Sequence, residues 1–170
     1  SYIIYATFFA EHLITDFAFS VKSAGNLWSV LGIASIGSGL IWGMVSDRWG
    51  RKYGLAFVFF LQGCAFLLFS GIVLGKSNTA LYVSAFLFAL TAWSIPAIMS
   101  AAAGDFVGPS FAPAAFGFIT IFLGLGQVFG PLIGGRVAEA AGSFAPALLI
   151  ASGAALFGAF LSLLIKPVTT

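Results

Sequence analysis

The chain has 170 residues, of which 61% are hydrophobic and only 7% are charged, and its formal net charge is +2. Because soluble domains are about 25% charged, this composition excludes an ordinary globular domain. A single cysteine and a single histidine exclude a disulfide framework, a thiolate metal cluster and an all-histidine metal site. We therefore expect no metal and no cofactor, and the scattered charges offer no basic surface to nucleic acid.

Long uncharged stretches between the charged residues are the main structural signal. Each can supply one helix of roughly 20 apolar residues, which crosses a hydrocarbon core about 30 Å thick. A transmembrane β-barrel would instead show alternating strands of about 10 residues. We therefore predict an all-α polytopic membrane protein with a single domain over residues 1–170. Its six transmembrane helices are predicted at 1–19, 25–46, 53–74, 79–103, 112–138 and 143–165.

The basic residues predict which side of the membrane each loop faces. An even number of crossings places both termini on one side, and basic residues in short loops favour the cytoplasm. We therefore expect both termini and the short 46–53 connection to be cytoplasmic. The basic residues assigned to the cytoplasmic side are Arg48, Arg51, Lys52 and Lys166, against Lys22, Lys76 and Arg136 on the other side.

The two halves of the chain share a pattern of glycine and acidic residues. The shift that aligns them spans three helices, so the second copy would lie upside down in the membrane relative to the first. Inverted three-helix repeats are typical of secondary transporters, and we predict repeats over about 1–75 and 79–166. Glycine-rich packing without a repeat is the alternative. The aligned pairs are Gly25 with Gly117, Gly32 with Gly124, Gly43 with Gly135, Gly50 with Gly142, and Asp47 with Glu139.

The most specific string, GMVSDRWGRK, begins at Gly43. We expect the second helix to end at Ser46 and Asp47 to lie near the start of the third, where free amide groups favour an anion. Gly43 would let another helix pass closely, and Gly50 allows a sharp turn. A capped helix in a basic loop is the plainer alternative.

A second glycine-rich string lies in the fifth predicted helix. Glycines four residues apart share a helix face and let a neighbouring backbone approach closely, and an internal proline kinks the helix. Such a smooth, kinked helix suits a sliding interface, whereas a static glycine contact is the alternative. Its positions are Gly117, Gly126, Gly130, Pro131, Gly134 and Gly135.

The first predicted helix carries ionisable side chains at membrane depth, where they are costly and usually functional. Glu11 and Thr15 share one face, with His12 and Asp16 on the adjacent face. A buried Glu11 could take up a proton that His12 relays. Alternatively, both side chains meet water at the membrane surface. On the third and fifth helices, Gln62 and Gln127 are expected to form interhelical hydrogen bonds.

Together, the two glycine strings resemble signatures of the major facilitator superfamily of secondary transporters, and the resemblance covers essentially the whole chain. It implies one six-helix half of a fold that has two. It also implies a cytoplasmic gate, in which a basic residue of the loop pairs with an acid at the end of the fourth helix. The implied gate set is Gly43, Asp47, Arg48, Gly50, Arg51, Lys52 and Asp105, and the second string is similar to the antiporter-type signature.

In this family the first and fourth helices of each half line the central cavity. The resemblance therefore nominates a substrate and proton pathway on these helices. Its residues are Glu11, His12, Thr15, Thr91, Trp93 and Ser94, the last three just before a kink at Pro96.

The chain looks most like the C-terminal half of a bacterial member, because it begins without an initiator methionine and ends neatly after Leu164. The antiporter-type signature, however, belongs in the family to the N-terminal half. We expect a bacterial inner-membrane protein, not an enzyme, that moves a small solute by alternating access with proton coupling. Its partners would be lipid, the solute and the other half, in the same polypeptide or a second copy. The alternative is a non-transporting membrane assembly or scaffold subunit.

Overall fold

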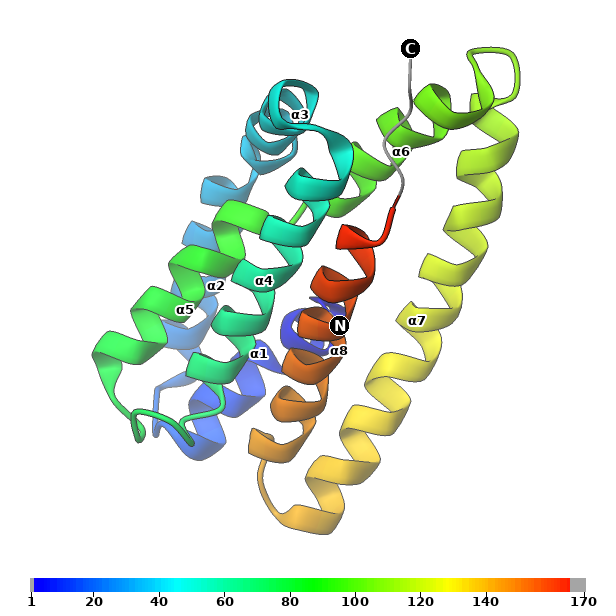
Figure 1. Cartoon of the computed structure of the whole chain (residues 1–170). Coiled ribbons are helices and arrows are strands. Elements are labelled where there is room, and N and C mark those ends of the chain that lie inside the picture. Colours follow the sequence, from blue (N-terminus) through cyan, green and yellow to red (C-terminus); the bar gives the residue numbers. More distant parts are fainter. Residues whose placement is uncertain (1, 166–170) are drawn as a thin grey trace.

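The computed structural model describes residues 2–165, and Lys166 of the predicted cytoplasmic basic group lies outside them. The described residues form helices joined by short turns, without strands, which confirms the all-α class (Figure 1). The helices are α1 (Tyr2–Asp16), α2 (Val21–Ser35), α3 (Ser38–Trp49), α4 (Arg51–Phe69), α5 (Asn78–Thr91), α6 (Ser94–Val107), α7 (Ala112–Ala141) and α8 (Ala145–Leu163).

Five segments of the described chain are long and apolar enough to cross a membrane, and α1 is a sixth, shorter helix of 15 residues. The chain is thus a multi-pass membrane protein, consistent with half of the predicted twelve-helix fold. The five segments are Val21–Trp49, Arg51–Phe69, Asn78–Val107, Ala112–Ala141 and Ala145–Leu163.

Two of the predicted helices are each broken in the middle. The predicted 25–46 helix divides into α2 and α3 at Gly37, and the predicted 79–103 helix divides into α5 and α6 before Trp93. The second break follows from Pro96, which lacks an N–H and clashes with the carbonyl one turn earlier. The first break is not predictable from the sequence, because a single glycine inside an apolar stretch does not by itself end a helix.

Two predicted helix ends also lie too far along the chain. The first helix ends at Asp16 rather than at 19, because Ala18 has φ 56° and Ser20 caps α2 by accepting a hydrogen bond from the Ser23 N–H at 3.1 Å. Helix α4 ends at Phe69 rather than at 74, and Gly71 follows with φ 70°.

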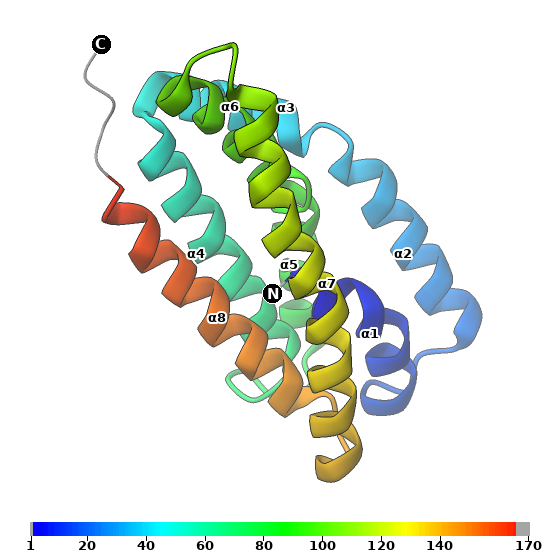
Figure 2. The same ribbon diagram turned by 90° about the vertical axis from the view of Figure 1, so that its right-hand side faces the viewer.

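The connections define two ends of the bundle, visible in Figure 1. The α1–α2, α4–α5 and α7–α8 connections meet at one end, here called the Asp16 end. The α3–α4 and α6–α7 connections meet at the other, here called the Arg51 end. Helices α2 and α3 run beside α5 and α6, while α4 packs most extensively on α8 (Figure 2). Helix α7 is the least buried span, with no buried residue in its most apolar window.

The core joins α1, α2, α4, α5 and α8, and within it aromatic side chains of α1, α4 and α5 pack against one another. Tyr5 is fully buried and stacks on Phe88 with ring centroids 4.2 Å apart. Its hydroxyl lies 2.9 Å from Ser84 Oγ, which itself donates to the Ala65 carbonyl at 2.7 Å. Tyr5 is therefore the donor, and one hydrogen-bonded chain links α1, α5 and α4 through the centre of the bundle.

Candidate functional site

The two helix breaks face one another and are joined by hydrogen bonds. The Trp93 backbone N–H donates to Ser38 Oγ at 3.1 Å, and the Trp93 indole donates to Ser35 Oγ at 3.2 Å. In return, Ser94 Oγ donates to the Ser38 carbonyl at 3.3 Å. Because a membrane interior supplies no water to unpaired backbone groups, Ser38 Oγ provides the acceptor for the Trp93 N–H at the break.

Two further side chains satisfy the last carbonyls of α5. The Trp42 indole donates to the Leu90 carbonyl at 2.9 Å, and Gln62 Nε2 donates to the Thr91 carbonyl at 3.1 Å. The predicted interhelical role of Gln62 is confirmed. Side chains of α3 and α4 therefore stabilise the break between α5 and α6.

A cavity of about 540 Å³ lies beside these breaks. The side chains that line it are uncharged, and several are aromatic. Trp93 lines the cavity as one of the nominated pathway residues, whereas Thr91 and Ser94 are fully buried at the break and are not among its lining residues. At its rim, Gln127 Nε2 donates to the Tyr2 hydroxyl at 2.9 Å, which is the interhelical bond expected of Gln127.

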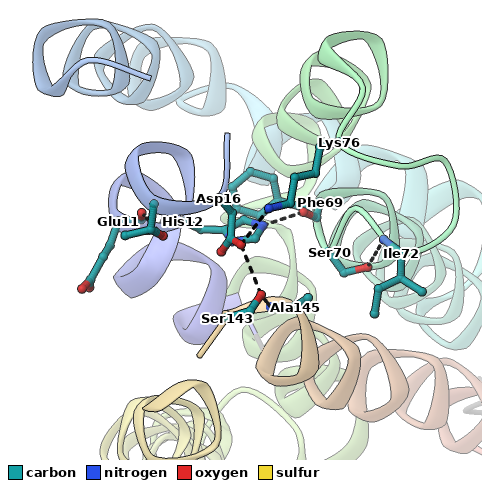
Figure 3. A network of polar contacts seen from close by, with 10 residues as sticks. Glu11, His12, Asp16, Phe69, Ser70, Ile72, Lys76, Ser143 and Ala145 are labelled. Carbon is teal, nitrogen blue, oxygen red and sulfur yellow. Dashed lines mark hydrogen bonds and ion pairs between the residues drawn. The ribbon is translucent and has the colours of Figure 1, made fainter. Parts of the chain in front are cut away.

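His12 lies at the centre of a polar network at the Asp16 end (Figure 3). Its ring is 1% exposed, with Nδ1 2.7 Å from Asp16 Oδ2 and Nε2 2.8 Å from the Phe69 carbonyl oxygen. The other Asp16 oxygen accepts from Lys76 Nζ at 3.1 Å and from Ser143 Oγ at 3.3 Å. The network thus joins α1, the end of α4, the α4–α5 loop and the α7–α8 connection.

Glu11 points away from this network (Figure 3). It lines a separate cavity of about 300 Å³ together with Thr15, Glu139 and Ser143. The nominated pathway residues are therefore distributed over three places: Trp93 beside the breaks, His12 in the buried network, and Glu11 with Thr15 in the cavity near the end of α7. Among the partners of His12 in this network, Asp16 alone could be found from the sequence, by its spacing of four from His12.

Arg51 joins three helices at the opposite end. Its Nε donates to Asp105 Oδ2 at 2.6 Å, its Nη1 donates to Ser46 Oγ at 2.9 Å, and the same Nη1 pairs with Asp47. The predicted pairing of a basic loop residue with Asp105 is confirmed, with Arg51 in that role. Arg48 is exposed, and Lys52 Nζ lies 4.7 Å from the centre of the Tyr53 ring.

The predicted position of Asp47 was wrong. Helix α3 continues to Trp49, so Asp47 lies in its last turns rather than at the start of the following helix. Gly50, with φ 96°, makes the turn, as predicted. The glycine that permits close helix contact here is Gly54, where a Cβ would lie 2.6 Å from Ser46 Cβ; at Gly43 it would meet nothing within 4 Å.

Only part of the glycine string of α7 lies in close contact with another helix. A Cβ at Gly130 would lie 2.9 Å from the Ile3 side chain, and one at Gly134 would lie 3.1 Å from Phe8, so α1 crosses α7 closely there. At Gly117 and Gly126 a Cβ would meet nothing within 4 Å, and Gly135 lies in ordinary contact with Phe8. Helix α7 continues through Pro131 to Ala141.

Within the described residues, no group of three or more His, Cys, Asp or Glu side chains is placed to hold a metal ion. The polar groups instead form the three arrangements above: a pair of satisfied helix breaks beside an uncharged cavity, a buried histidine network, and an arginine joined to two carboxylates. These arrangements can bind a small solute, hold a proton, and join or separate helix ends.

Comparison with known proteins gives a consistent result. A family model described as "Uncharacterised MFS-type transporter YbfB" matches residues 1–163. The chain is 31% identical over 153 residues to solute carrier family 22 member 18 of Mus musculus, which covers 87% of this chain and 36% of that protein. It is 30% identical over 151 residues to solute carrier family 67 member A1 of Homo sapiens, covering 86% and 34%. The chain thus spans about a third of the length of these relatives. No solved structure gives a significant match.

Proposed function

Because the chain belongs to the MFS-type transporter family, within the major facilitator superfamily, we propose that it is one six-helix half of a transporter that moves a small solute by alternating access. The observation that carries this proposal is the pair of helix breaks that meet beside the 540 Å³ cavity. Discontinuous helices that meet at a cavity within the membrane are characteristic of substrate sites in secondary transporters.

In this proposal the cavity beside Trp93 receives the solute, and Thr91 and Ser94 hold the break that shapes it. Its lack of charged lining residues favours a solute without a strong negative charge. Glu11, His12 and Thr15 would belong to a pathway for a coupled proton.

The Arg51 end would form the cytoplasmic gate. Arg51 holds the end of α3 and the end of α6 together while it pairs with Asp47 and Asp105. Gly50 supplies the turn between α3 and α4, and Arg48 and Lys52 would face the anionic membrane surface. Both termini would then be cytoplasmic, in the bacterial inner membrane that the sequence predicts.

The second six-helix half would cover the exposed faces of α2 and α7, either within one polypeptide or as a second copy. Helix α7 would move against α1 along its closely packed glycines, Gly130 and Gly134. The inverted relationship between 1–75 and 79–166 is part of this proposal, because it would let the two triplets rock against each other.

The test uses the full-length protein in oriented vesicles and needs no known solute. A reporter cysteine replaces Gly32, which lines the cavity where a Cβ meets nothing within 4 Å, in a background in which Cys64 is replaced by Ser. Membrane-impermeant maleimide is added from one side or the other. Asp105→Asn, which weakens the gate, should raise labelling from the cytoplasmic side and lower it from the outer side.

Asp105→Glu is the matched control, since it keeps the charge and should leave both labelling rates near the wild-type values. Rates that stay fixed in Asp105→Asn, or that rise together on both sides, would count against alternating access. Fixed rates together with stable partner binding would instead support the assembly or scaffold subunit.

A further inference from the structure

We propose that His12 and Asp16 form a proton-binding site at the Asp16 end. The bound proton allows His12 of α1 to donate a hydrogen bond to the last carbonyl of α4. This inference rests on the proposed function, because it names the site that a coupled proton would occupy. It assigns that role to the buried pair rather than to Glu11.

The hydrogen-bond geometry requires an additional proton on the ring. A carbonyl oxygen can only accept, so Nε2 must carry a hydrogen to bond the Phe69 oxygen at 2.8 Å. An ionised carboxylate also only accepts, so Nδ1 must carry a hydrogen to bond Asp16 Oδ2 at 2.7 Å. Neutral imidazole has a hydrogen on one nitrogen only. With Asp16 ionised, both contacts are hydrogen bonds together only when His12 is the imidazolium ion.

The surroundings of Asp16 keep this carboxyl group ionised. Its second oxygen accepts from the Lys76 ammonium at 3.1 Å, and an ammonium group can only donate. A nearby positive charge favours the carboxylate form. Ser143 Oγ lies 3.3 Å from the same oxygen. The exchangeable proton between the two side chains therefore belongs on the histidine ring.

Loss of this proton has a specific structural consequence. The one remaining N–H would stay with the carboxylate, which is the stronger acceptor. The Nε2 lone pair would then face the Phe69 carbonyl oxygen, leaving a buried acceptor without a donor. Water cannot easily replace the donor, because the ring is 1% exposed and is flanked edge-on by Phe17, Phe69 and Phe144. Deprotonation thus removes the hydrogen bond between α1 and the end of α4.

Among the described residues, one charged group faces the His12–Asp16 pair from the elements packed around it, Lys76 from the α4–α5 loop. From the α7–α8 connection comes the neutral Ser143 hydroxyl, and α4 contributes the Phe69 carbonyl at its C-terminus, where a cation is favoured. The remaining charged side chains of α1, α2 and α7, Glu11, Lys22, Arg136 and Glu139, are exposed, and the two of α4, Arg51 and Lys52, lie at its opposite end.

Nitrogen-15 NMR of the full-length protein labelled at histidine tests the proposal directly. The chain contains one histidine, and the difference from a His12→Asn spectrum assigns its signals even if the full polypeptide contains others. At about pH 7.5, where free histidine is about one-tenth protonated, wild-type His12 should show hydrogens on both ring nitrogens. Asp16→Asn should leave one nitrogen bare at the same pH.

Glu11→Gln is the matched control and should leave the His12 spectrum unchanged, because Glu11 points away from the ring. A neutral ring in the wild type, or an imidazolium that persists in Asp16→Asn, would overturn the proposal. If Asp16→Asn does not fold, the wild-type and Glu11→Gln spectra still decide it. The readout involves no transport, so a neutral ring leaves alternating access standing, and fixed Gly32→Cys labelling rates leave this result standing.

Discussion

At the Asp16 end His12, and at the Arg51 end Arg51, join helices through hydrogen bonds to several acceptors, but the two arrangements differ in their exposure to solvent. The His12 and Asp16 side chains are 1% and 10% exposed. Arg51 is 21% exposed, and its partners Asp47 and Asp105 are 59% and 44% exposed. Water can replace the partners of Arg51 when the helix ends separate, whereas it cannot readily replace those of His12.

This difference suggests a division of labour within the proposed transport cycle. An exposed ion pair contributes little net free energy, so it can form and break with each cycle. A buried pair is costly to break by removing one partner, so it responds mainly to a change in its own charge. We infer that the Arg51 end suits mechanical opening and the Asp16 end suits control by a proton.

The largest expected effect is at the buried end. His12→Ala removes the donor to the Phe69 carbonyl and the partner of Asp16, and should lower the free energy of unfolding by about 3–5 kcal/mol. Chemical unfolding in detergent, followed by tryptophan fluorescence, measures this change. His12→Gln should recover part of the loss, because its amide can donate one of the two hydrogen bonds. A loss below about 1 kcal/mol in His12→Ala would show that this network contributes no more to stability than an exposed ion pair.

Features that depend on neighbouring residues in the sequence can be predicted from it, whereas features that depend on contacts between distant segments cannot. The apolar spans and the Gly50 turn were predictable, because hydropathy and turn chemistry are properties of the local sequence. The pairing of a basic loop residue with Asp105 was implied by the family resemblance, which left open whether Arg48 or Arg51 makes it. The Gly37 break was not predictable, since it depends on Ser38 meeting Trp93 across the bundle. The burial of His12 was not predictable either, because the spacing of polar residues along α1 does not show which face of the helix contacts α4.

Packing along α7 sharpens the comparison between the ends. This helix is open at Gly117 and Gly126, and it is closely packed on the first half of α1 at Gly130 and Gly134. Gly134→Val should destabilise the protein by about 1–3 kcal/mol, because the new side chain overlaps Phe8 and Ile4. The same substitution at Gly153 of α8, where a Cβ meets nothing within 4 Å, should change stability by less than about 0.5 kcal/mol. Equal effects at both positions would remove the difference in packing.

At the exposed end, Asp105→Asn should change the free energy of unfolding by less than about 1 kcal/mol, even though it removes a partner of Arg51 in the proposed gate. The contribution of the pair should also shrink as salt is raised, since ions screen exposed charges over about 8 Å at physiological ionic strength. Unfolding curves at low and high salt, compared with those of the wild type, measure both quantities. A decrease of several kcal/mol in the free energy of unfolding that is independent of salt would show that Arg51 contributes like a buried pair, as His12 does.

The smallest effect is expected for Glu11→Gln, which tests whether the Asp16 end depends on one pair or on its acidic residues in general. Glu11 is adjacent to His12 in sequence, yet it is exposed and faces the cavity shared with Glu139. Its neutralisation should change the free energy of unfolding by less than about 0.5 kcal/mol between about pH 6 and pH 8. A larger change that follows pH over this range would mean that Glu11 and Glu139 share the proton, and the division between a buried proton site and a solvated acidic cavity would no longer hold.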